Sequence, residues 1–221
     1  LAVGAPYKDG NGKDSGHVRV FQYVKSVWTQ LGSNIDGENA DDIFGYSVSL
    51  SSDGTIVAVG APQRFAYPTA GSGYVRVYKR TNKAWTQLGN DIYGEAIHDN
   101  FGTSVSLSSN GTVLAVGAID NNGINGDGSG HVRVFKYSNN AWTQLGSDID
   151  GEAARDKSGG SVSLSSDGTV LATGARFNDG NAGDDTAYGH VRVYQFPTPQ
   201  PTPQPTKKPA TKNNKPTKPK Y

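Results

Sequence analysis

The sequence lacks several residue types and patterns that define whole classes of protein. None of its 221 residues is cysteine, which excludes disulfide frameworks, cysteine-based zinc fingers and iron–sulfur sites. It has no run of 18 apolar residues, so we predict no transmembrane helix within it. Methionine is also absent and the first residue is Leu1. We therefore expect an N-terminus produced by processing or truncation, with any signal peptide upstream of it.

The last 25 residues differ in composition from all the others. Residues 197–221 contain eight of the 11 prolines, six lysines, five threonines and no acidic residue. Such a segment cannot bury enough apolar area to fold, so we predict a disordered linker or stalk. Threonine together with proline is also typical of O-glycosylated stalks. Because its six lysines are positively charged, this tail is also a candidate for contact with an anionic polymer.

Residues 1–196 are acidic and form the expected folded domain. Without the six lysines of the tail, the 21 basic residues fall to 15, against 20 acidic residues, which leaves a formal charge of −5. This charge argues against nucleic-acid binding by the folded part. About 196 residues are enough for one domain with a hydrophobic core.

A repeat of about 57 residues runs through this domain. The string Trp-Thr-Gln-Leu-Gly begins at Trp28, Trp85 and Trp142. The strings Ser-Val-Ser-Leu, Val-Arg-Val and Val-Gly-Ala (Thr-Gly-Ala in the last copy) recur with the same period. Tandem repetition at a fixed period is the signature of repeat architectures, so this period guides the fold prediction.

Within one repeat the apolar residues recur at every second position, which indicates β-strands. Residues 104–107 alternate polar and apolar, Asn110-Gly111 follows, and residues 112–116 form an apolar run. Asn-Gly and Asp-Gly are the pairs that two-residue hairpin turns favour, so we predict such a turn here. Further strands are predicted at 131–137 and 141–145. No window of 11 or more residues has helical periodicity.

Four short antiparallel strands in each repeat predict an all-β fold, a β-propeller built from tandem four-stranded blades. A β-solenoid is the alternative, although its coils are usually shorter. Along the chain we expect about 14 strands in groups of three, four, four and three, or about three and a half blades. Closed propellers contain about 4–8 whole blades, so we expect residues 1–196 to be part of a larger propeller.

The motifs resemble the FG-GAP repeats of integrin α-subunit-type propellers. Successive repeats carry a Phe-Gly pair and then a Gly-Ala or Gly-Ala-Pro strand end, which degenerate in the last copy: Phe44-Gly45 with Gly60-Ala61-Pro62, Phe101-Gly102 with Gly117-Ala118, and Gly159 with Gly174-Ala175. The resemblance covers about 196 residues. It implies an extracellular propeller, seven-bladed when complete, that binds a ligand or partner.

The calcium loop of that family, Asp-x-Asp/Asn-x-Asp-Gly, is not expected at the equivalent turns. The interval from Ser51 to Thr55 offers one carboxylate, that of Asp53, whereas calcium takes about six to eight oxygen ligands. The loops between the second and third strands are richer in Asp, Asn and Gly. They are either ordinary solvated turns or a calcium site, whose ligands would come from Asp120, Asn122, Asp127, Asp179, Asn181 and Asp184.

Two further segments are candidates for contact or modification. Arg64, Phe65 and Tyr67 interrupt the repeat with one cation and two aromatic side chains. These residue types are favoured at partner contacts, so we predict a ligand-binding role for them. Asn110 begins the triplet Asn-Gly-Thr, an N-glycosylation acceptor that is usable only if the chain is secreted.

Residues that recur in the repeats are predicted to be structural. Histidine occupies one repeat position at His17, His131 and His190, and Tyr74 occupies it in the remaining copy, which indicates packing rather than catalysis. The recurring arginines are predicted to pair with acids of the adjoining blade, and the tryptophans to pack between blades. No nucleophile or base stands out from the repeat background, so we predict no catalytic residue and no cofactor beyond the hypothetical calcium.

These features predict a non-catalytic binding or adhesion module, secreted or at the cell surface, with a protein or glycan ligand. One alternative is an accessory propeller of an enzyme whose catalytic domain lies outside this sequence. Another is a structural wall or matrix repeat without a discrete ligand. Saturable binding to a defined partner distinguishes the first reading from the last.

Overall fold

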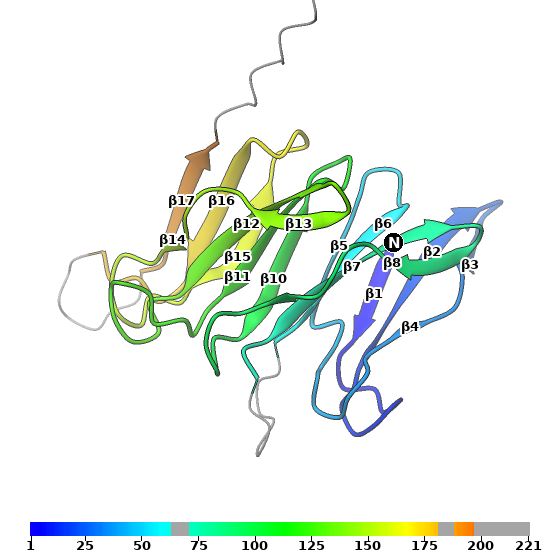
Figure 1. Ribbon diagram of the computed structural model, residues 1–221, viewed down its shortest axis with the longest axis horizontal. Helices are drawn as coiled ribbons and strands as arrows, with labels where there is room; N and C mark the ends of the chain where they lie inside the picture. Colours follow the sequence, from blue (N-terminus) through cyan, green and yellow to red (C-terminus); the bar gives the residue numbers. More distant parts are fainter. Residues whose placement is uncertain (63–70, 181–187, 197–221) are drawn as a thin grey trace, which may run out of the picture.

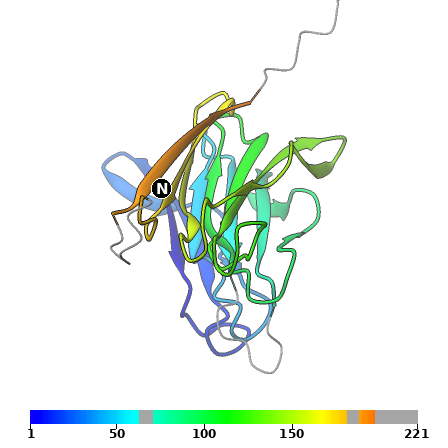
Figure 2. The same cartoon turned by 90° about the vertical axis from the view of Figure 1, so that its left-hand side faces the viewer.

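The computed structural model describes residues 1–62, 71–180 and 188–196, and all regular elements in these residues are β-strands. The strands form four antiparallel sheets, which lie side by side in chain order in Figure 1. Figure 2 looks along this row from the β17 end and shows the sheets stacked one behind another. In the described residues, no helix is present that is long and apolar enough to cross a membrane.

Each sheet corresponds to one blade. The first contains β1 (Ala2–Ala5), β2 (His17–Val24), β3 (Val27–Gln30) and β4 (Ile35–Asp36). The second contains β5 (Ser47–Leu50), β6 (Ile56–Ala61), β7 (Tyr74–Thr81), β8 (Ala84–Gln87) and β9 (Ile92–Tyr93). The third contains β10 (Phe101–Leu107), β11 (Val113–Ala118), β12 (His131–Ser138), β13 (Ala141–Gln144) and β14 (Ile149–Asp150). The fourth contains β15 (Ser158–Leu164), β16 (Val170–Ala175) and β17 (His190–Gln195).

The main strands of each blade are hydrogen-bonded in chain order, as in a propeller. The predicted grouping of three, four, four and three is confirmed by the paths β1–β3, β5–β8, β10–β13 and β15–β17. The sequence pattern missed the two-residue strands β4, β9 and β14, which pair with the starts of β2, β7 and β12. Two residues are too few for a period of two to be recognisable.

The hydrophobic core lies between neighbouring blades. Val75 and Val77 of β7 belong to one buried cluster with Leu114 and Val116 of β11. Such packing of one sheet against the next removes both faces of an inner blade from water, which is the main favourable contribution to folding. Two of the three tryptophans take part as predicted: the indole Nε1 of Trp85 donates to the carbonyl oxygen of Leu31 at 2.7 Å, and that of Trp142 donates to the carbonyl oxygen of Leu88 at 2.8 Å, each in the preceding blade. Trp28 in the first blade is instead 55% exposed.

The recurring glycines mark the closest approach between blades. A Cβ atom added to Gly60 would lie 2.1 Å from the carbonyl oxygen of Gly102 in the next blade, and one added to Gly117 would lie 2.0 Å from that of Gly159. A side chain would therefore overlap backbone that cannot rotate away, and only glycine fits. The Phe-Gly and Gly-Ala motifs are thus the two halves of one contact, repeated at each interface.

The first hairpin of each blade differs from the predicted two-residue turn. Five residues, 51–55, connect β5 to β6, and positive φ occurs at Gly54 but not at Asp53. Instead the Asp53 carboxylate accepts hydrogen bonds from Ser51 Oγ (2.6 Å) and from the backbone N–H of Thr55 (3.0 Å). The predicted hairpin is confirmed by the antiparallel pairing of β5 with β6, but its connection has five residues and not two, and the side chain of the aspartate stabilises it.

Candidate functional site

A pocket of about 850 Å³ lies among the loops of the second and third blades. Its walls come from residues 95–100 before β10, residues 120–128 between β11 and β12, and residues of β14 and the segments around it. Lys157 is the lysine that lines it, and the acidic residues lining it are Glu95, Asp99, Asp120, Asp127, Asp148 and Asp150. We call it the acidic pocket, since this excess of carboxylates favours cationic ligands.

Asp99 holds two of these loops together. Its side chain is buried, and its Oδ2 accepts hydrogen bonds from the backbone N–H groups of Glu95 (3.1 Å) and Ala96 (2.8 Å) and from Asn121 Nδ2 (3.0 Å). Asp156 repeats this arrangement with Asn178 one blade further on. A buried carboxylate with several donors is a structural group, so Asp99 shapes the pocket rather than contacting a ligand.

The three described residues of the hypothetical calcium set in this loop all line the acidic pocket. Asp120 forms a 2.6 Å ion pair with Lys157 and accepts a hydrogen bond from Asn100. Asn122 Oδ1 accepts a 3.1 Å hydrogen bond from the backbone N–H of Gly128, and Asp127 is exposed. Calcium binding at this loop stays a prediction. In the next blade Asp179 is half-buried, whereas Asn181 and Asp184 lie outside the described residues.

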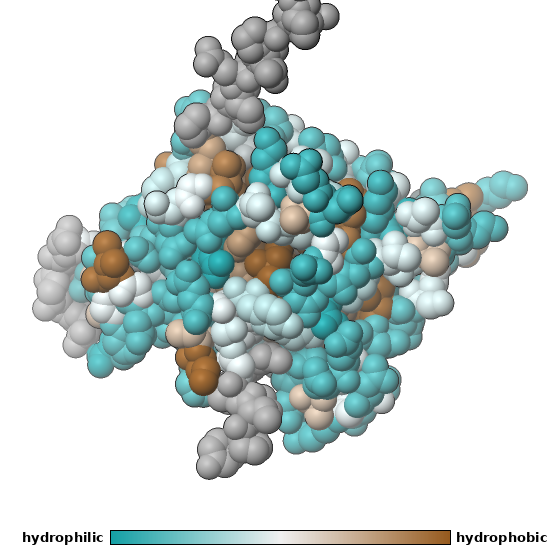
Figure 3. Space-filling model, in the orientation of Figure 1, coloured by the Kyte–Doolittle hydropathy of each residue, from teal (hydrophilic) through white to brown (hydrophobic). Residues whose placement is uncertain are grey.

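Two exposed isoleucines border the acidic pocket. Ile97 and Ile124 belong to different loops, line the pocket, and are 64% and 87% exposed. On the face drawn in Figure 3, hydrophobic residues form small separate patches in a hydrophilic surface. Neither residue was predicted from the sequence as a contact candidate. The signal that could have found them is an aliphatic side chain within an Asp-, Asn- and Gly-rich loop.

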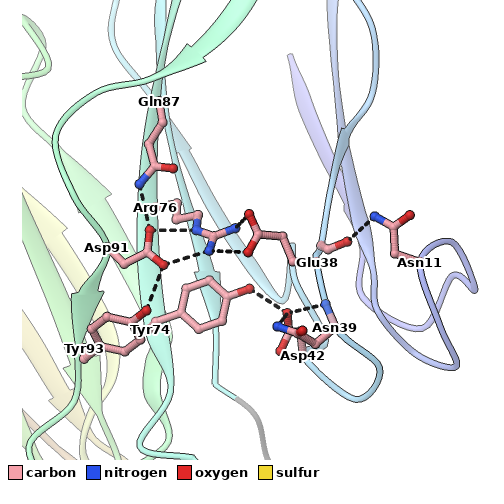
Figure 4. Close-up of polar contacts among 10 residues, drawn as sticks. Asn11, Glu38, Asn39, Asp42, Tyr74, Arg76, Gln87, Asp91 and Tyr93 are labelled. Atoms are coloured by element: carbon pink, nitrogen blue, oxygen red, sulfur yellow. Dashed lines mark hydrogen bonds and ion pairs between the residues drawn. The ribbon is translucent and has the colours of Figure 1, made fainter.

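The residues of the second repeat that correspond to Glu95 and Asp148 of the pocket wall are Glu38 and Asp91. They form an ion-pair cluster around Arg76 (Figure 4). The guanidinium donates to both carboxylate oxygens of Asp91, at 2.8 and 2.7 Å, and contacts both oxygens of Glu38 at 2.8 and 2.9 Å. Gln87 and Tyr93 also donate to Asp91, at 2.7 and 3.0 Å. The predicted pairing of the arginine with an acid of the adjoining blade is confirmed here.

Electrostatics reinforces this cluster. Burial alone would raise the pKa of the Asp91 carboxyl, but hydrogen bonds from Arg76, Gln87 and Tyr93 outweigh it, so the pKa lies below its ordinary value of 3.8. Burial alone would lower the pKa of Arg76, yet its bonds to Asp91 and Glu38 raise it. The neighbouring Tyr74 donates from its hydroxyl to Asp42 Oδ2 at 2.9 Å. Every charge in this cluster therefore has a close partner.

In the third blade the same position is looser. Arg133 Nε donates to Gln144 Oε1 (3.0 Å) and an Nη donates to the carbonyl oxygen of Tyr93 (3.2 Å). Its nitrogens stay 3.8 Å from Glu95 and 4.0 Å from Asp148. The predicted ion pairing therefore recurs, but with longer separations than at Arg76.

The histidine position also differs between these blades. His131 is fully buried, its Nδ1 lies 4.0 Å from Asp148 Oδ2, and neither ring nitrogen has a hydrogen-bond partner. Burial lowers the pKa of this imidazole, so the ring is neutral near pH 7. Glu95, His131 and Asp148 place one ligand atom each within 4.8 Å of one another. The sequence analysis assigned His131 to packing, which its burial supports, but missed its two acidic neighbours.

Two groups of sequence candidates remain. Arg64, Phe65 and Tyr67 are outside the described residues. Asn110 is exposed in the turn between β10 and β11, where its Oδ1 accepts hydrogen bonds from Ser108 Oγ (2.9 Å) and from the backbone N–H of Thr112 (3.0 Å). Its glycosylation stays a prediction.

Comparison with known proteins supports the repeat and the fold. A solved structure of a candidate 6-phosphogluconolactonase from Bacteroides uniformis resembles the chain with a TM-score of 0.51 and 14% sequence identity. The similarity covers 81% of this chain and 43% of the lactonase chain, so this chain spans less than half of the length of that protein. At this sequence identity the similarity bears on the fold alone. No curated protein matches the chain. Residues 94–135 match the FG-GAP repeat family, so this part of the chain is an FG-GAP repeat, as the resemblance predicted.

Proposed function

We propose that this chain is a non-catalytic binding module of FG-GAP propeller type, secreted or at the cell surface, that recognises a protein or glycan through the loops around the acidic pocket. The sheets supply a rigid frame, and the loops between strands supply the variable contacts. Binding residues are concentrated on such loops because substitutions there do not disturb the blades.

The observation that carries this proposal is the combination of an acidic pocket with exposed aliphatic side chains. Ile97 and Ile124 border a cavity whose walls hold six carboxylates and one lysine. Exposed apolar side chains next to a polar depression are typical of contact surfaces, where they become buried on binding. A ligand that fits presents a cationic group to the carboxylates and an apolar group to the isoleucines.

A lactonase activity like that named for the structural neighbour is less consistent with this pocket. A phosphorylated sugar lactone is an anion, and the excess of carboxylates would repel it. Asp99 and Asp120, which otherwise resemble acid–base candidates, are engaged by Asn121 and Lys157. Among the described lining residues, no serine, threonine or cysteine is available as a nucleophile.

The test is a binding measurement with matched variants. Arrays of basic peptides and of amino-sugar glycans identify a ligand, and biolayer interferometry then measures its Kd for the wild type and for Ile124→Ser. Losing a buried isoleucine contact costs about 1.5 kcal/mol or more, so we expect at least about a tenfold rise in Kd. Val27→Ala is the control, because Val27 is exposed in the first blade and Ala84 and Ala141 occupy its position in the next two.

Two outcomes would contradict the proposal. If no ligand on either array binds saturably, the structural-repeat alternative gains support. If a ligand binds but Ile124→Ser has the same Kd as Val27→Ala, the binding surface lies away from the acidic pocket.

A further inference from the structure

We propose that Glu95, His131 and Asp148 bind a divalent transition-metal ion of the Zn²⁺ class at the wall of the acidic pocket. This inference goes beyond the proposed function, because a metal would be held there whether or not the loops bind a protein or glycan. It also concerns residues other than the loop residues Asp120, Asn122 and Asp127, for which the sequence suggested calcium.

The three candidate ligand atoms already lie close to one another. One imidazole nitrogen and one oxygen from each carboxylate lie within 4.8 Å of one another. Zinc bonds of about 2.0–2.2 Å in a tetrahedron place ligand atoms about 3.3 Å apart. His131 Nδ1 and Asp148 Oδ2, now 4.0 Å apart, need to approach by less than about 1 Å. The Glu95 side chain is half-exposed and can rotate toward them.

His131 independently lacks the hydrogen-bond partners that a buried imidazole needs. Its side chain is buried beside the two carboxylates, and both of its ring nitrogens lack a hydrogen-bond partner. A buried polar atom left without a partner is costly and rare in proteins. At the same repeat position, Tyr74 donates to Asp42 and His190 Nδ1 lies 2.9 Å from Glu152 Oε2. A metal bonded to one nitrogen of His131 would supply a partner that the protein itself does not.

The second and third blades differ in how closely an arginine pairs with the two carboxylates. In the second blade Arg76 contacts all four carboxylate oxygens of Glu38 and Asp91 within 2.9 Å. A metal ion would therefore compete with the guanidinium for each of these oxygens. In the third blade Arg133 is held by Gln144 and by the Tyr93 carbonyl oxygen instead. Asp148 Oδ1 accepts a 2.6 Å hydrogen bond from Gln144 Nε2, so Asp148 Oδ2, which lies 4.0 Å from His131 Nδ1, is its oxygen for a metal. The Glu95 carboxylate stays 3.8 Å from Arg133 and can supply the second oxygen.

The ligand set selects the class of metal. Calcium and magnesium take oxygen ligands, whereas an imidazole nitrogen combined with carboxylates suits zinc and neighbouring first-row ions. Three protein ligands also leave one tetrahedral position for a fourth ligand. An exogenous ligand atom, such as a carboxylate or imidazole of a bound partner, would fit that position.

The test uses the 221-residue chain without a histidine tag. Isothermal titration with ZnCl₂ should show one site per chain with a Kd in the micromolar range or below. Replacement with Co²⁺ should give the intense visible absorption of a tetrahedral complex. Glu95→Gln and Asp148→Asn should each raise the Zn²⁺ Kd at least about tenfold, since even the partners of metal ligands contribute that much.

His131→Tyr is the most direct variant, because tyrosine occupies this position naturally at Tyr74. It should abolish the site, and His17→Tyr, the same substitution in another blade, should leave it unchanged. The proposal is overturned if the wild type shows no one-to-one Zn²⁺ binding. It is equally overturned if Glu95→Gln and His131→Tyr bind Zn²⁺ as tightly as His17→Tyr. Because the readout is the metal alone, failure here is distinguishable from failure to find a macromolecular ligand.

Discussion

Replacing Arg76 by methionine should destabilise the fold more than the same change at Arg133. Methionine retains an apolar stem that packs where the arginine stem packed, so the comparison isolates the guanidinium. The two arginines occupy the same repeat position on β7 and β12, 57 residues apart. They differ mainly in how closely their charges are paired.

The structure sets the size of the expected effect. Arg76→Met leaves Asp91, whose side chain is 14% exposed, without its countercharge. A hydrogen bond to such a charged group contributes about 1.5–3 kcal/mol. The pair with Glu38, whose side chain is 62% exposed, adds less than about 1 kcal/mol. We therefore expect Arg76→Met to lower the free energy of unfolding by about 3 kcal/mol.

For Arg133 the closest carboxylate oxygens are 3.8 and 4.0 Å away, and its hydrogen bonds go to neutral acceptors. The expected loss for Arg133→Met is about 1 kcal/mol. For a domain of this size 1 kcal/mol corresponds to about 2–4 °C in Tm. Calorimetric melting at pH 7 should thus show a decrease of about 6–12 °C for Arg76→Met and about 2–4 °C for Arg133→Met. Equal decreases in the two variants would refute the assignment of a tighter cluster to the second blade.

Two further predictions concern a carboxylate of the Arg76 cluster and a contact between the third and fourth blades. The folded-state pKa of Asp91 lies below its ordinary value of 3.8, so the carboxylate contributes stability that is present above about pH 4 and is lost as the pH falls through the folded pKa. The Tm difference between wild type and Asp91→Asn, measured from pH 6 to pH 2.5, should therefore shrink below pH 4; a constant difference would contradict this. Gly117→Ala should cost about 1–3 kcal/mol in a urea titration, because the new Cβ would lie 2.0 Å from the Gly159 carbonyl oxygen. In Gly174→Ala the atom nearest to the new Cβ is the Ser161 hydroxyl oxygen, at 2.6 Å, which can rotate away, so this variant should change stability by less than about 1 kcal/mol. Equal losses of stability in the two variants would show that the contact between blades is not the cause.

Local and repeated features of this protein were predictable from its sequence. The period of two in Ser-Val-Ser-Leu and the 57-residue recurrence of Trp85 and Trp142 predicted the strands, their order and their grouping into blades. These features are determined locally, because side-chain alternation and turn residues act over a few neighbouring positions. Gly60 and Gly117 were recognisable as a motif, although the reason for the glycine, a backbone carbonyl of the next blade, was not visible in the sequence.

The candidate site was decided by tertiary structure. Tyr74 and His131 share one repeat position, so the sequence indicated packing for both, yet one donates to Asp42 while the other lies unpartnered beside Asp148. The orientation of Arg133 depends on Gln144 and on a carbonyl of another blade. Such contacts join segments from different blades, and no local period encodes them. The repeat therefore determined the frame, whereas the packing of one blade against the next determined which of its recurring side chains remain available to bind.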